Sequence, residues 1–80
     1  MKIKVFVAVQ ADLEYEVDDV MIVIQEGNEG EEDFVERRCW VRGFDDVDWT
    51  EANAYAEELA KTLGVEFVGE IAEEYVGEDE

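Results

Sequence analysis

Apolar residues occupy every odd position from Ile3 to Val17, while the even positions change from mixed residues to acids after Gln10. A period of two over this length is typical of a β-strand, or of two strands that keep the same face inward across a turn. We therefore predict a first strand over about residues 2–10. Because no glycine or proline marks a turn, residues 12–19 either continue this strand or open the next one.

Three further segments have the pattern of strands. The continuous apolar run 20–24 predicts a central strand that is covered on both faces. A polar turn with two glycines, over 25–33, separates it from a third strand over 34–42. Residues 65–68 predict a short fourth strand, and 71–76 predict either an edge strand or its extension.

One helix is predicted between the third and fourth strands. Apolar residues recur three and four positions apart from Ala52 to Leu63, Asp48 and Glu51 form a capping box, and Gly64 is placed for the C-cap. The order β-β-β-α-β predicts an α+β fold. We expect a small antiparallel sheet of three or four strands with one helix packed on one face.

The net charge of the chain limits the kind of partner that it can bind. Its 80 residues include 24 Asp and Glu against 6 Lys and Arg, a net charge of −18, and 48% are hydrophobic, enough for a core. We predict one domain over 1–76 and a frayed acidic tail over 77–80. The charge argues against direct contact with nucleic acids or anionic membranes, so a basic protein is the expected partner.

The residue types that are missing also limit the function. Histidine, serine and proline are absent, which removes the commonest general base and the commonest hydroxyl nucleophile, so we predict no enzyme activity and no cofactor. Cys39 is the only cysteine, which favours a reducing compartment. With no membrane span and no signal peptide in the pattern, we expect a cytoplasmic protein.

The most regular acidic pattern lies within residues 12–19. On an extended backbone the alternate acids share one face, about 6.6 Å apart, and form a ladder of negative charge. A solvated strand edge that blocks aggregation is the alternative interpretation. Acids recur in every polar segment, which favours the steering of a basic partner. The candidate partner-binding acids are Asp12, Glu14, Glu16, Asp18, Asp19, Glu29, Glu31, Glu32, Asp33, Asp45, Asp46 and Asp48.

A second candidate surface is basic and aromatic. Arg38, Trp40 and Arg42 share a face of the third predicted strand, and Lys2, Lys4 and Phe6 share one on the first. Such faces bind single-stranded nucleic acid by stacking. The net charge and the single helix argue against that role here. The alternatives are cations that pair with acids across strands, and a Trp40 that lies in the core or at a homodimer contact.

The segment after the third strand resembles a calcium loop only in part. Asp46, Asp48, Thr50 and Glu57 fall at positions 1, 3, 5 and 12 of an EF-hand register. The glycine required at position 6 is replaced by Glu51, so we predict no specific metal site.

In size, charge and ladder, the chain resembles the small acidic inhibitors of bacteriophages and mobile elements, which include DNA-mimic antirestriction proteins and many anti-CRISPR proteins. The resemblance implies a non-enzymatic inhibitor, acting in the cytoplasm of a bacterial host, that occupies the basic nucleic-acid channel of a CRISPR effector or restriction enzyme. Three alternatives stay open: a halophile's housekeeping protein, a structural or assembly module that uses Trp40 or the helix, and an antitoxin bound to a basic toxin.

Overall fold

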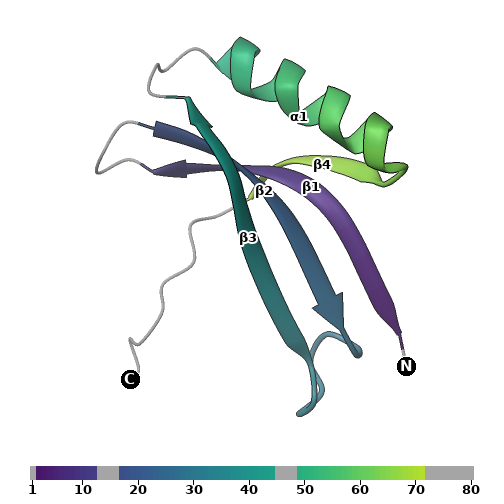
Figure 1. Cartoon of the computed structure of the whole chain (residues 1–80). Helices are drawn as coiled ribbons and strands as arrows, with labels where there is room; N and C mark the ends of the chain where they lie inside the picture. Colours follow the sequence, from purple (N-terminus) through teal and green to yellow (C-terminus); the bar gives the residue numbers. More distant parts are fainter. Residues whose placement is uncertain (1, 13–16, 45–48, 72–80) are drawn as a thin grey trace.

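The computed structural model describes residues 2–12, 17–44 and 49–71. It contains four strands and one helix in the predicted order β-β-β-α-β, so the α+β fold is confirmed. The elements are β1 Ile3–Asp12, β2 Val17–Glu26, β3 Val35–Phe44, α1 Trp49–Leu63 and β4 Glu66–Ile71 (Figure 1). The predicted extension over 71–76 and the predicted tail fall largely outside the described residues.

The sheet is mixed, which corrects the prediction of a purely antiparallel one. Its strand order is β3-β2-β1-β4, with antiparallel pairs among β1, β2 and β3 and a parallel pair between β1 and β4. The helix explains the difference. It carries the chain from the end of β3 back along the sheet, so β4 must run in the same direction as β3 and β1.

The core lies mainly on the face of the sheet that α1 covers. Val7, Val9 and Val20 have no exposed surface, and they pack with the helix residues Ala52 and Ala56. Because alanine has only a methyl side chain, it lets the helix backbone approach the sheet closely. The other face buries a smaller cluster, formed by Phe6, Ala8 and Val23 with Met21 and Ile71 at its edge. The central strands β1 and β2 are therefore apolar on both faces.

The helix ends as its sequence predicts. Gly64 has a φ of 74°, its N–H donates to the Lys61 carbonyl, and the Val65 N–H donates to the Ala60 carbonyl at 3.0 Å. This pair of bonds is a Schellman motif, which satisfies carbonyls that the helix leaves open. Val65 then packs against the main core and leads the chain into β4. The predicted N-terminal cap, Asp48, lies outside the described residues.

The helix covers only one end of its face. Figure 1 shows α1 above the end of the sheet where β1 stops and β2 starts, while the N-terminus and the β2–β3 turn extend beyond it. Ile3 and Val35, at the uncovered end, are 59% and 39% exposed. Within the described residues, no helix is long and apolar enough to cross a membrane.

Because α1 lies close to the sheet, the free energy of unfolding should depend strongly on the size of the helix side chains that face it. Ala56→Leu adds volume to a fully buried position and should lower the free energy of unfolding by about 1–3 kcal/mol. Ala54→Leu, on the exposed side of the same helix, is the control and should change it by about 0.5 kcal/mol or less. Urea unfolding measures both, and equal effects would contradict the packing described here.

Candidate functional site

The β2–β3 turn presents the densest acidic surface among the described residues. Glu29, Glu31, Glu32 and Asp33 are all exposed within five consecutive positions. These four, called the acidic turn below, were among the predicted partner-binding acids. Figure 1 shows the turn at the end of the sheet that α1 does not cover. Its carboxylates are therefore accessible to a large partner.

The backbone of the turn is held by hydrogen bonds. The Gly27 N–H donates to the Lys2 carbonyl at 2.9 Å, Glu31 N–H to Asn28 at 3.0 Å, and Phe34 N–H to Glu31 at 3.1 Å. Gly27 has a φ of 89°, and a Cβ there would lie 3.3 Å from the Asp33 carbonyl oxygen, so a glycine suits this position for two reasons. The acidic turn thus holds its charges on a defined backbone.

The predicted ladder over residues 12–18 is divided between two strands. Asp12 pairs with Val17 across an antiparallel hairpin, and Ala11 pairs with Asp18. The side-chain alternation of β1 and β2 places Asp12 on the face opposite α1 and Asp18 on the face toward it. Asp18 is also only 6% exposed, so the prediction that it joins an exposed ladder is wrong.

Of the remaining predicted acids, the structure describes Asp19 and leaves five outside the described residues. Asp19 lies on the sheet face opposite α1, where it contacts Trp40. Glu14, Glu16, Asp45, Asp46 and Asp48 lie outside the described residues. The structure adds a second group of exposed acids on α1 and β4, which the sequence prediction did not place among the partner-binding residues. They are Glu51, Glu57, Glu58, Glu66 and Glu70.

The arginines of β3 are engaged within the chain. Arg37 forms an ion pair with Glu26 at 2.7 Å, and Arg38 forms one with Glu36 at 2.8 Å. The Arg42 guanidinium lies over the Phe44 ring, 4.7 Å from its centroid. The prediction that cations pair with acids across strands is confirmed for Arg37. These contacts reduce the positive charge that β3 offers to a partner.

A β-bulge separates Arg42 from the basic and aromatic face that was predicted. Val20 pairs with Arg42 but Met21 pairs with Trp40, so Val41 is an extra residue in β3. Arg42 is turned toward the helix side, where it also stacks over Tyr55 at 5.4 Å. Arg38 and Trp40 stay together on the opposite face.

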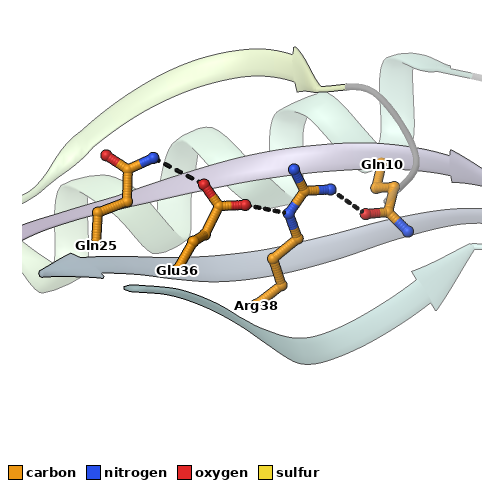
Figure 2. Close-up of polar contacts among 4 residues, drawn as sticks. All are labelled: Gln10, Gln25, Glu36 and Arg38. Carbon is orange, nitrogen blue, oxygen red and sulfur yellow. Dashed lines mark hydrogen bonds and ion pairs between the residues drawn. The ribbon is translucent and has the colours of Figure 1, made fainter. Parts of the chain in front are cut away.

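A polar network crosses that opposite face (Figure 2). The Gln25 amide donates to Glu36 at 2.8 Å, and the Arg38 guanidinium donates to Glu36 and to the Gln10 side chain, each at 2.8 Å. Arg38 therefore reaches from β3 across β2 to β1. The network lies over the face where Ala8 and Val23 have no exposed surface although the helix is on the other side.

The network changes the titration of Glu36. Burial by itself raises the pKa of this carboxyl, but the hydrogen bonds from Gln25 and Arg38, together with the Arg38 charge, outweigh burial and lower the pKa below 4.5. Glu36 therefore stays ionised at neutral pH and holds Arg38 in place. The negative charge of Glu36 therefore has a structural role, because it holds the network together.

The described residues contain no group of three or more His, Cys, Asp or Glu that could hold a metal ion. The loop that resembles a calcium site falls partly outside them, because Asp46 and Asp48 are not described. A groove along α1 is lined by Tyr55, Glu58, Leu59 and Thr62. Its wall is mostly apolar and carries one carboxylate.

Comparison with known proteins gives no relative: no family model, curated protein or solved structure matches the chain. The class that the structure defines is a small acidic α+β protein with a four-stranded mixed sheet and one helix.

The lowered pKa of Glu36 predicts a pH-dependent effect of Glu36→Gln. A carboxyl with a lowered folded-state pKa stabilises the fold above its unfolded pKa, near 4.5, and this contribution is lost as the pH falls through the folded pKa. At pH 7 the variant should be less stable by about 1 kcal/mol, and the difference from the unsubstituted protein should shrink as the pH falls below 4.5.

Urea unfolding at several pH values measures this difference. Glu58→Gln, at an exposed helix position, is the matched control because it removes the same charge without touching the network. If both variants follow the same pH profile, then Glu36 acts only through the overall charge.

Proposed function

We propose that the protein is a non-enzymatic inhibitor that binds the basic nucleic-acid-binding surface of a bacterial defence complex, such as a CRISPR effector or a restriction enzyme. One observation carries the proposal: exposed carboxylates project from the acidic turn, α1 and β4, while the arginines of β3 are engaged within the chain. The surface is therefore strongly negative on several sides.

The carboxylates would meet lysine and arginine side chains of the target in place of DNA phosphates. Contacts of this kind depend on charge, so they weaken as salt screens it. The acidic turn is the best candidate for the main contact because its backbone is already ordered, which reduces the entropy lost on binding. The turn lies at the end of the sheet that α1 does not cover (Figure 1), so the helix would not hinder its entry into a channel.

Neutralising the acidic turn should weaken the inhibition. We expect Glu29→Gln combined with Glu31→Gln and Glu32→Gln to raise the concentration needed to displace labelled duplex DNA from the target about tenfold, at about 0.5 kcal/mol for each exposed charge pair. Fluorescence anisotropy of the duplex, bound to a purified CRISPR effector or restriction enzyme at about 0.1 M salt, measures the displacement.

The matched control removes three exposed charges elsewhere, with Glu57→Gln, Glu58→Gln and Glu66→Gln. Equal losses in the two triple variants would show that overall charge, and not the acidic turn, drives binding. The assay is repeated with a panel of purified CRISPR effectors and restriction enzymes, and failure of the unsubstituted protein to displace DNA from all of them would refute the inhibitor proposal.

The exposed Trp40 favours a second function, a structural or assembly module. Such a module would bind its partner through aromatic contact, so its binding would tolerate high salt and depend on Trp40. Raising the salt to about 0.5 M in a binding assay with the same target separates the two functions.

A further inference from the structure

Trp40 and Asp19 form a polar and aromatic pair on the sheet face opposite α1. Trp40 is 62% exposed, which is unusual for the largest apolar side chain. Its indole N–H donates to Asp19 Oδ1 at 3.0 Å, so the ring is held at its edge by a carboxylate. Asp19 accepts this bond through Oδ1, and its side chain is only half-buried.

Gly43 provides the space for this pair. It lies opposite Asp19 in the β2–β3 register. A Cβ at Gly43 would lie 3.0 Å from Asp19 Oδ1 and 3.6 Å from an indole carbon of Trp40. A larger residue would therefore have to displace the Asp19 carboxylate or the Val17 side chain, which would lie 3.1 Å from the added Cβ, so the position of the carboxylate depends on this glycine of β3.

Cations of the chain lie over several of its aromatic rings. Lys4 lies over Phe6 at 5.6 Å, and Arg42 lies over both Phe44 and Tyr55. Among the described residues, no cation–π contact is made to Trp40. The bulge at Val41 contributes to this, because it turns Arg42 away from the face that Trp40 occupies.

We infer that Trp40 and Asp19 bind an arginine side chain of the basic partner. The inference rests on the proposed function and names a contact within it. An indole face attracts a cation more strongly than the other aromatic side chains do, and an adjacent carboxylate accepts hydrogen bonds from a guanidinium. Arginine fits better than lysine because its planar group stacks on the ring while its N–H groups reach the carboxylate. The net charge of −18 further favours a cationic ligand.

The test uses hexa-arginine as the probe and the full chain as the receptor. Nuclear magnetic resonance of the indole N–H groups follows the titration, and Trp40→Phe assigns the Trp40 signal against that of Trp49. We expect the Trp40 signal to shift, and Trp40→Leu to weaken binding about tenfold because it keeps an apolar side chain but removes the ring. Asp19→Asn should weaken binding more than Glu58→Gln, which removes one charge far from the ring.

Two results would overturn the inference. One is that Trp40→Leu and Asp19→Asn bind hexa-arginine as well as Glu58→Gln does, which would show diffuse attraction by charge. The other is that hexa-lysine binds as tightly as hexa-arginine and shifts the Trp40 signal equally. Trp40→Phe, which keeps a smaller ring, should give an intermediate affinity. Thermal unfolding of each variant confirms that it is folded.

The arginine site and the inhibitor proposal can fail independently of each other. If hexa-arginine binds at Trp40 but the protein displaces no DNA from any defence complex, the arginine site stands and the inhibitor proposal fails. If the protein displaces DNA but hexa-arginine leaves the Trp40 signal unshifted, the inhibitor proposal stands and the arginine site fails.

Discussion

The fold depends on burying enough apolar surface to outweigh the mutual repulsion of its carboxylates. The net charge of the chain is −18, and this charge opposes folding. The apolar burial that outweighs it is concentrated in β1 and β2, the two central strands, which are apolar on both faces. The helix covers one face through small alanine side chains. The network of Gln10, Arg38, Glu36 and Gln25 lies over part of the other (Figure 2).

The arginines of β3 are placed where they offset part of the repulsion among the carboxylates. Three of the six cations lie on β3, at an edge of the sheet, and each contacts a carboxylate or an aromatic ring of the chain. Charged side chains and a bulge at an edge strand also hinder pairing with other chains. β3 therefore stabilises the fold and protects its edge, while the excess acids remain on the turn, the helix and β4.

The sequence predicts the strands and the helix better than it predicts how the strands pair and in which direction they run. Period-two patterns and short apolar runs predict the four strands, and the apolar stripe with Gly64 predicts the helix, because each is a local signal. The direction of β4 depends on where α1 returns the chain, and the bulge at Val41 depends on pairing with β2, so neither has a local signal. That bulge is why Arg42 leaves the predicted basic face, and the β1–β2 hairpin is why Asp18 is buried.

Charge alone does not make a selective binding protein. Long-range attraction raises the rate of association with any basic surface, whereas specificity needs groups fixed at defined positions. The acidic turn and the Trp40–Asp19 pair are such groups, because hydrogen bonds hold the backbone of one and the side chains of the other. A DNA mimic that carried only diffuse charge would bind many cellular proteins. An arginine held between an indole and a carboxylate would give this protein a way to choose among them.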